Sequence, residues 1–264
     1  MKILVFCMEC QKELGHPSFE PILADYYDGA TAHLECSRGH KSTVLLQSQK
    51  FEILLESAAN ALLEGFTMEA ASSLSAAYER FIEFSINVFC KKNLTSKQAL
   101  EETFRLISKQ SERQLGGFLF LHLITFGRSY VLNKKITELR NKVIHQGYIP
   151  SPKEVTVFGT LIYQEIYSIS QLLKSNMPNE IQQVIMDDLQ SKNAKVPLEA
   201  HRSTCTGATF FSLSMAEQKK DFNEALAAYK EYKNMVSDST QLMNIMNKMM
   251  SVVVSTSVKM RGKA

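Results

Sequence analysis

The pattern of hydrophobic and polar positions changes near residue 48. Before it, the runs at 2–6 and 41–47 are rich in residues that favour β-strands. After it, apolar residues recur every three or four positions, which is the spacing that gives a helix one buried face. Residues 48–175 contain no strand-like alternation. The pattern therefore predicts a mainly α-helical protein, in which a small N-terminal β module precedes an antiparallel helical bundle.

The limits of the helices follow from the same pattern. Helices are predicted at 51–64, 68–89, 95–112, 132–146 and 152–173. Residues that cap or stop helices stand at their ends, namely Gly65, Thr95 or Ser96, and Ser151 before Pro152. The Gly116-Gly117 pair predicts a break in the chain. The apolar run at 118–126 predicts a buried segment, in which His122 is a hydrogen-bonded core residue.

Beyond residue 175 the chain becomes more polar, and a short helix is predicted at 180–190. Two additional C-terminal helices are predicted at 215–235 and 239–260. The last of these carries a stripe of methionines, for which core or dimer packing is a better explanation than a binding groove. The chain is thus expected to comprise three parts, at 1–47, 48–175 and 176–264.

Composition indicates the class of protein but does not indicate what the protein binds. The 264 residues are 45% hydrophobic and 22% charged, which suits a globular protein with a real core. The net charge of +3 neither requires nor excludes a nucleic-acid partner. The chain has no apolar window of roughly 18 residues and no signal-peptide core, so a cytoplasmic protein without a membrane partner is expected.

Three of the five cysteines lie in the first forty residues, in a pattern typical of a zinc ribbon. Cys7 and Cys10 form one pair of ligands, and Cys36 and His40 form the other. Two such knuckles give the four tetrahedral ligands that Zn²⁺ prefers, and a site with four protein ligands is structural rather than catalytic. The alternative is a set of unrelated buried cysteines. His16 and His33 are possible substitutes for His40, but neither has knuckle spacing from Cys36.

A second group of polar residues stands at the end of the helix predicted at 132–146. Arg140, Asn141 and His145 fall within about a turn and a half of helix, which Gly147 is expected to stop. At about 100° per residue, Asn141 and His145 share a face turned away from the apolar stripe. A fixed cation beside an imidazole is what phosphodiester chemistry requires, because one stabilises phosphate charge and the other moves protons.

The sequence Arg140-Asn141-x3-His145 resembles the R-N-x3-H signature of HEPN domains, and the likeness covers about residues 48–175. The helix at 70–84 adds to it, since HEPN domains often carry an acidic residue there that faces the motif. The resemblance implies a bundle of four to five helices that dimerises with two motifs across a shared cleft. It also implies a metal-independent endoribonuclease, of the kind used in toxin–antitoxin, phage-defence and RNA-processing systems. An antitoxin or a defence-complex protein would then be a further partner.

The resemblance also assigns roles to individual residues. His145 is expected to act as general base or acid in the attack of a 2′-hydroxyl on the adjacent phosphate, and Arg140 to stabilise the developing charge. Asn141 is expected to orient groups, and Glu79 or Glu83 to fix the imidazole tautomer. The candidates for RNA backbone contacts are Lys134, Lys135 and Lys142.

Two other interpretations compete with a nuclease. Arg140 and His145 are cations at a helix C-terminus, where the helix dipole favours them without any chemistry. The chain is alternatively a non-catalytic RNA-binding module, or a protein-interaction or sensor module. Tyr148 stands three residues after the histidine, whereas some HEPN toxins place a tyrosine two residues after it, so no role is assigned to Tyr148.

Overall fold

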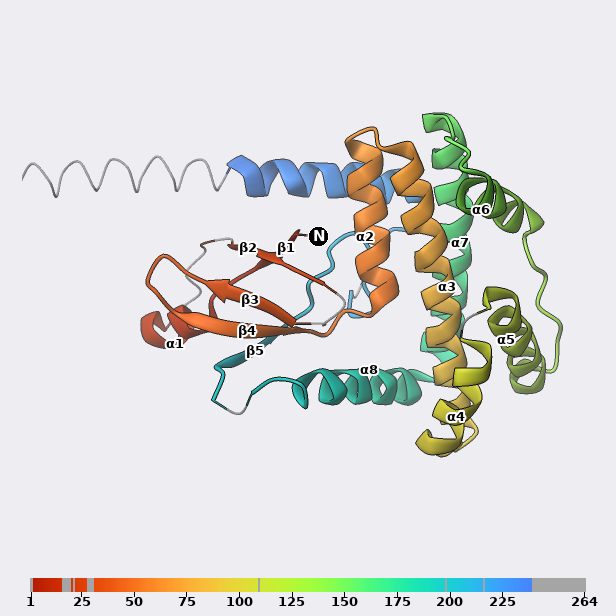
Figure 1. Ribbon diagram of the computed structural model, residues 1–264, viewed down its shortest axis with the longest axis horizontal. Helices are drawn as coiled ribbons and strands as arrows, with labels where there is room; N and C mark the ends of the chain where they lie inside the picture. The colour runs from red at the N-terminus through yellow and green to blue at the C-terminus, as the bar shows by residue number, and fades with distance from the viewer. Residues whose placement is uncertain are drawn as a thin grey trace, which may run out of the picture.

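The structure is a computed structural model that describes residues 2–238, apart from 16–19, 21, 28–30, 109, 198 and 216. The helix predicted at 239–260 and the alternative ligand His16 therefore lie outside the described residues. The described chain is mainly helical, with two small sheets formed largely by its N-terminal part, as the hydrophobic pattern predicts (Figure 1). None of the described helices combines the length and the apolar character needed to cross a lipid bilayer.

The N-terminal module contains two small sheets and one short helix. Strands β1 (Lys2–Val5) and β2 (Ile22–Asp25) pair antiparallel, as do β3 (Thr31–Glu35) and β4 (Lys41–Leu46). Helix α1 (Met8–Leu14) follows β1. The two strands adjoining the cysteine pairs thus form where the sequence predicts them.

A strand from the far end of the chain completes the second sheet. β5 (Arg202–Cys205) pairs with β4 in parallel, so residues more than 150 positions apart share a ladder. The sequence analysis predicts no strand here, because four residues are too few to show an alternating pattern. The free edge of β4 supplies the hydrogen bonds that order β5. The N-terminal module and the C-terminal part are therefore structurally joined.

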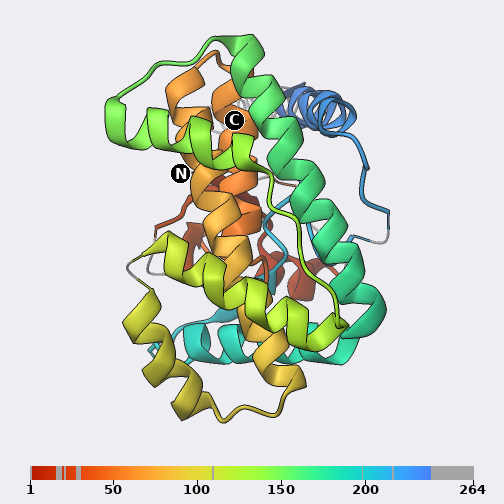
Figure 2. The same ribbon diagram turned by 90° about the vertical axis from the view of Figure 1, so that its right-hand side faces the viewer.

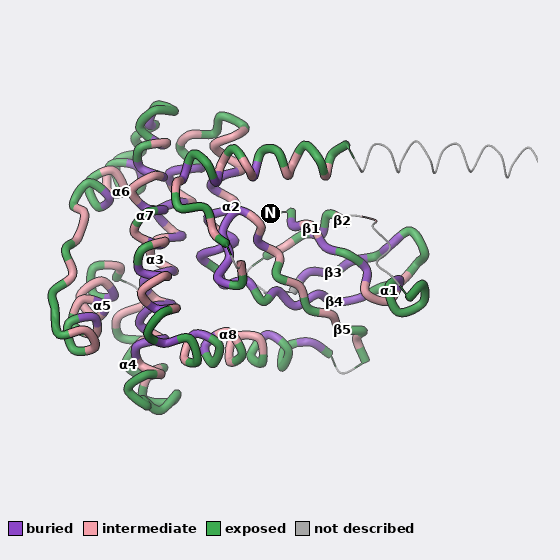
Figure 3. The backbone as a smooth tube through the Cα atoms, turned by 180° about the vertical axis from the view of Figure 1, so that it is seen from behind, coloured by how far each residue is buried: buried purple, intermediate pink, exposed green. Residues whose placement is uncertain are grey.

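The helices form a bundle around α3, which has buried residues along its whole length (Figure 3). The helices that follow the sheets are α2 (Lys50–Leu63), α3 (Thr67–Lys92), α4 (Lys97–Ile107), α5 (Ser111–Phe126), α6 (Lys134–Gln146), α7 (Pro152–Asn176) and α8 (Pro178–Asn193). A further helical stretch covers residues 222–238. Figure 2 shows α5 and α6 on one side of α3. Most predicted helix ends agree with these limits to within a few residues, and Ser151 caps α7 as expected.

Two features around α5 differ from the prediction. The helix runs straight through Gly116 and Gly117, and α4 ends at Ile107, before the predicted limit. Glycine costs about 1 kcal/mol in a helix relative to alanine, which lowers stability without forcing a break. The run at 118–126 is amphipathic rather than buried, because Phe120 and Ile124 are 68% and 69% exposed.

The loop after β5 is tied to α2 by two buried carboxylates. Glu52 accepts hydrogen bonds from the backbone N–H groups of Leu213 and Gln49, and Glu56 accepts from those of Thr209 and Phe210. Burial raises the pKa of Glu52 to about 7, although these N–H donors act in the opposite direction. The loop is thereby held against the bundle by hydrogen bonds that satisfy its backbone.

Candidate functional site

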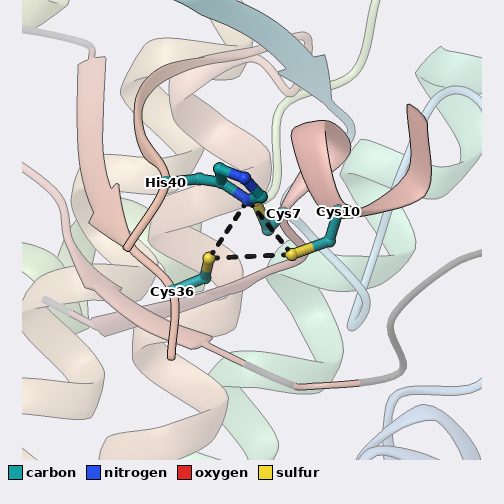
Figure 4. A group of neighbouring side chains, drawn as sticks. All are labelled: Cys7, Cys10, Cys36 and His40. Atoms are coloured by element: carbon teal, nitrogen blue, oxygen red, sulfur yellow. Dashed lines mark hydrogen bonds between the residues drawn. The ribbon is translucent and has the colours of Figure 1, made fainter. Parts of the chain in front are cut away.

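The four predicted metal ligands meet between α1 and the hairpin of β3 and β4 (Figure 4). Cys7 precedes α1 and Cys10 lies in its first turn, while Cys36 and His40 flank the turn from β3 to β4. Gly39 has φ 83°, a left-handed conformation that this tight turn requires and that glycine adopts at no steric cost. The candidate ligand atoms all lie within 4.8 Å of one another.

Four of the six distances between these atoms are close to those of tetrahedral coordination. The Sγ atoms of Cys10 and Cys36 are 3.6 Å apart, and His40 Nδ1 lies 3.3, 3.5 and 3.7 Å from the Sγ atoms of Cys10, Cys36 and Cys7. Zinc–ligand bonds of about 2.3 Å to sulfur and about 2.0 Å to nitrogen would place neighbouring ligands about 3.5 to 3.8 Å apart. The cluster can therefore hold a metal ion.

Without a cation, the buried cysteines favour the thiol form over the thiolate at Cys10. Burial raises the pKa of Cys10 to about 12, and the hydrogen bonds that its thiol donates to the other two cysteines raise it further. A bound cation would offset this cost by neutralising the thiolates. His40 Nε2 lies 2.9 Å from Glu13 Oε1, which orients the ring with Nδ1 toward the sulfur atoms. A carboxylate behind a histidine is a frequent outer partner of metal ligands.

The other candidate metal ligands lie elsewhere. His33 is exposed on β3, and its Nδ1 lies 3.2 Å from Thr43 Oγ1. Cys90 and Cys205 are the remaining free cysteines, on α3 and β5. Only Cys7, Cys10, Cys36 and His40 come together among the described residues.

The motif of α6 forms the second candidate site. Asn133 caps the start of the helix, and Gly147, with φ 64°, ends it as predicted. Ile136 and Val143 are buried against the bundle, which turns the polar face of α6 outward. Asn141 is half-buried, and His145 is exposed one turn further along the helix.

Arg140 links this face to two other helices. Its Nη2 lies 2.7 Å from Glu79 Oε1 on α3 and donates to Ser111 Oγ on α5 at 3.1 Å. Its Nη1 donates to Asn141 Oδ1 at 3.0 Å and lies 3.3 Å from His145 Nε2. Because a guanidinium group can only donate, the last contact requires Nε2 to be the unprotonated nitrogen of the ring. A cavity of about 60 Å³ lies behind these groups, between α3, α5 and α6.

The two acidic candidates take different partners from those predicted. Glu79 binds the guanidinium group of Arg140, and Glu83 binds Arg80 with an Nη1–Oε2 distance of 2.6 Å. Within the described chain, neither carboxylate contacts the imidazole, so neither takes the tautomer role expected of it, and Glu79 instead positions Arg140. A helical wheel identifies the face that these residues share, but it does not give the reach of each side chain.

The remaining residues near the motif lie on the surface. Lys134, Lys135 and Lys142 lie on α6, and all three are exposed. The hydroxyl of Tyr148 donates to Glu154 Oε1 at 2.8 Å, away from the motif. Ser111 was not singled out from the sequence, since a serine at the start of a helix carries no signal for a contact with an arginine about thirty positions away.

His122 is a hydrogen-bonded core residue, as the sequence predicts. It is buried on α5 among aromatic rings, and its Nδ1 lies 3.1 Å from the carbonyl oxygen of Arg128. Burial lowers its pKa, so the ring stays neutral near pH 7.

No family model, no curated protein and no solved structure matches this chain.

Proposed function

We propose that this chain is a HEPN-like, metal-independent endoribonuclease whose active unit is a homodimer. The observation that carries the proposal is the arrangement at the end of α6. There Arg140 is fixed by Glu79 and Ser111, while His145, in contact with the same guanidinium group, is exposed to a substrate. A fixed cation and an accessible base at one point are the two groups that RNA cleavage by internal attack needs.

In this mechanism His145 accepts the proton of a 2′-hydroxyl, whose oxygen attacks the adjacent phosphorus. The new P–O2′ bond forms as the P–O5′ bond breaks, which yields a cyclic phosphate and a 5′-hydroxyl. Arg140 stabilises the negative charge that develops on the phosphate oxygens. Asn141 Oδ1 accepts a hydrogen bond from Arg140 and so helps to orient the guanidinium group. Lys134, Lys135 and Lys142 contact the RNA backbone beside the motif.

A second copy of the chain supplies the other half of the site. The motif of one copy carries a single imidazole, whereas internal attack uses a base for the 2′-hydroxyl and an acid for the leaving oxygen. Phe120 and Ile124 on α5 and Ile144 on α6 are large, exposed apolar side chains on helices that pack on the same side of α3 (Figure 2). A dimer formed through this surface would cover them and bring two motifs together.

Zinc is the metal that the N-terminal cluster suits best. Three thiolates and one imidazole with tetrahedral spacing are typical ligands of structural Zn²⁺, and four protein ligands leave no position for a substrate. Zinc would therefore stabilise the small sheets and take no part in cleavage. The HEPN resemblance adds a cytoplasmic toxin–antitoxin or defence role, with an antitoxin or a complex protein as partner.

The decisive experiment is RNA cleavage in the presence of a chelator. Wild-type protein is expected to cut a mixed RNA substrate and leave cyclic phosphate ends, which mass spectrometry identifies. His145→Ala and Arg140→Ala should each lower the rate at least about a hundredfold, in line with the loss of a general base or of a charge-stabilising donor. His201→Ala, which removes an exposed imidazole elsewhere, is the matched control.

The main alternative is a module that binds RNA or protein without cutting. The contacts of Arg140 with α3 and α5 favour it, because they stabilise the bundle whether or not chemistry occurs. Cleavage that survives both substitutions, or that disappears only with the chelator, would refute the nuclease. Binding of RNA without cleavage would support the alternative.

A further inference from the structure

A second candidate binding site lies between α3, α4 and α8. This cleft has a volume of about 790 Å³, within the range of small-ligand sites. It lies toward the end of α3 opposite to α6 (Figure 1), and none of Arg140, Asn141 and His145 lines it. Nothing in the proposed nuclease mechanism uses it.

The cleft carries an excess of positive charge. Seven basic and four acidic side chains line it. Each acidic side chain is paired with a basic one, through Arg80–Glu83, Lys91–Asp187, Lys97–Glu101 and Lys192–Asp188. Arg105 on α4 and Lys195 just after α8 lie outside these four pairs. Both of these are exposed, so they can meet an anion without first being desolvated.

One wall of the cleft is apolar and lies outside the core clusters of the described residues. Helix α4 is amphipathic but has no fully buried residue. Its Leu100 and Phe104 lie one turn apart and line the cleft, half-buried, and neither belongs to the two core clusters found among the described residues. Because covering the part of these side chains that is still exposed is favourable, this wall is well suited to an apolar part of a ligand.

The amount of apolar surface favours a flat ring over a peptide helix. The other apolar side chains of α3, α2 and α8 in the lining, namely Phe84, Phe51 and Val184, are already buried. Leu100, Phe104 and the half-buried Tyr26 thus offer a platform for a flat ring. An amphipathic helix would need anchors over two turns or more. Nucleic-acid bases stack on such isolated aromatic rings, while basic side chains beside the ring hold phosphates.

We propose that this cleft binds a nucleotide unit, with its base against Phe104 and its phosphate near Arg105 and Lys195. The unit belongs either to a free nucleotide or to a single-stranded RNA, since the two share this chemistry. The inference is independent of the ribonuclease proposal, because its residues and its readout are separate from those of α6.

Binding is tested by calorimetric titration of the full chain with three probes. These are ATP, a ten-nucleotide single-stranded RNA of mixed sequence, and a ten-residue acidic peptide. All titrations use the His145→Ala variant, so that RNA stays intact. Further substitutions are then made in the cleft, with Lys219→Ala/Lys230→Ala as the control that removes two exposed charges elsewhere.

We expect Arg105→Ala/Lys195→Ala to weaken binding of ATP or RNA about tenfold or more, and to reduce the salt dependence of RNA binding by about one phosphate contact per residue. Phe104→Ala should weaken it about fivefold or more through lost stacking, whereas Phe104→Tyr should restore it. Binding of ATP identifies a free nucleotide, and binding of RNA alone identifies a strand. Equal affinities of cleft and control variants, binding of neither nucleotide probe, or binding of the acidic peptide alone would overturn the proposal.

Discussion

Arg140 joins three helices through one guanidinium group, with Glu79 on α3 as its charged partner at 2.7 Å. Both side chains are largely shielded from water, so the pair is worth more than a surface ion pair. Glu79→Gln keeps the size of the side chain and removes its charge. We expect the free energy of unfolding to fall by about 1–2 kcal/mol, measured by urea denaturation.

The matched control for this substitution is Glu83→Gln. Glu83 pairs with Arg80 one turn away on the same helix, with similar shielding from water, so Glu83→Gln removes a comparable ion pair that does not join separate helices. If Glu79→Gln proves no more destabilising than Glu83→Gln, the positioning role of Glu79 is wrong. In the nuclease proposal, Glu79→Gln should also slow cleavage, because Arg140 would no longer be held in place.

The sequence predicted which residues belong to each candidate site better than it predicted the contacts between them. Cys7, Cys10, Cys36 and His40 follow from spacing alone, because a knuckle brings ligands together whatever surrounds it. Arg140, Asn141 and His145 follow from helical periodicity for a similar reason. The contact of Glu79 with the guanidinium group, and the whole contribution of Ser111, depend on how separate helices pack, which periodicity does not describe.

Among the elements, those with a long repeating pattern were predictable and those held by tertiary contacts were not. The apolar stripes of α2, α3, α6 and α7 predict where these helices lie, and Ser151 predicts where α7 begins. By contrast, β5 forms because its backbone pairs with the edge of β4. Helix α5 likewise continues through two glycines. Local propensity favours neither outcome strongly, so the surrounding structure decides.

The carboxylate of Glu52 gives the junction of α2 and the loop at 209–213 a pH-dependent stability. Burial raises the pKa of Glu52 to about 7 in the folded chain, above the value of about 4.3 expected on unfolding. The folded state therefore binds the proton more tightly, and its stability should fall as the pH rises from about 4.5 to 7.

Comparison with Glu52→Gln isolates this effect from other titrating groups, because the amide of the variant cannot ionise. Relative to the variant, the wild type should lose on the order of 3 kcal/mol of unfolding free energy between pH 4.5 and 8. Denaturant titrations at several pH values measure the difference. A constant difference across this range would show that Glu52 stays ionised in the folded protein.

The metal cluster connects two secondary-structure elements, namely α1 and the hairpin of β3 and β4. We expect one Zn²⁺ per chain, and we expect its removal by a chelator to expose residues 1–47 to proteases. β5 should be released with them because it pairs only with β4 among the described strands. Far-ultraviolet circular dichroism should change little, because most helices belong to a separate core cluster.

Cys36→Ser and His40→Ala should each abolish stoichiometric zinc binding, measured by atomic absorption after dialysis. Cys205→Ser is the control, since Cys205 lies on β5 of the same sheet but outside the cluster. Retention of one zinc ion by both ligand variants would mean that the metal binds elsewhere.

At the scale of the whole molecule, the motif of α6 and the exposed apolar residues lie on helices that pack on one side of α3. If a second copy covers this side, wild-type protein should have twice the mass of one chain in light scattering. Phe120→Glu/Ile124→Glu places two carboxylates in that contact, where burying them costs several kcal/mol. The variant should be monomeric and lose RNA cleavage, although both side chains are exposed in the single chain and its fold should persist.

Met186→Glu is the matched control, because Met186 is half-exposed on α8, a different helix from those that carry the motif and the apolar residues. It should remain dimeric and active. A monomeric wild type that cuts RNA would separate the motif from dimerisation, and one His145 would then have to serve as both base and acid. A dimer that survives Phe120→Glu/Ile124→Glu and still cleaves would place the contact on another surface. Loss of cleavage together with loss of the dimer, in a variant that melts like the wild type, would establish that the second copy completes the site.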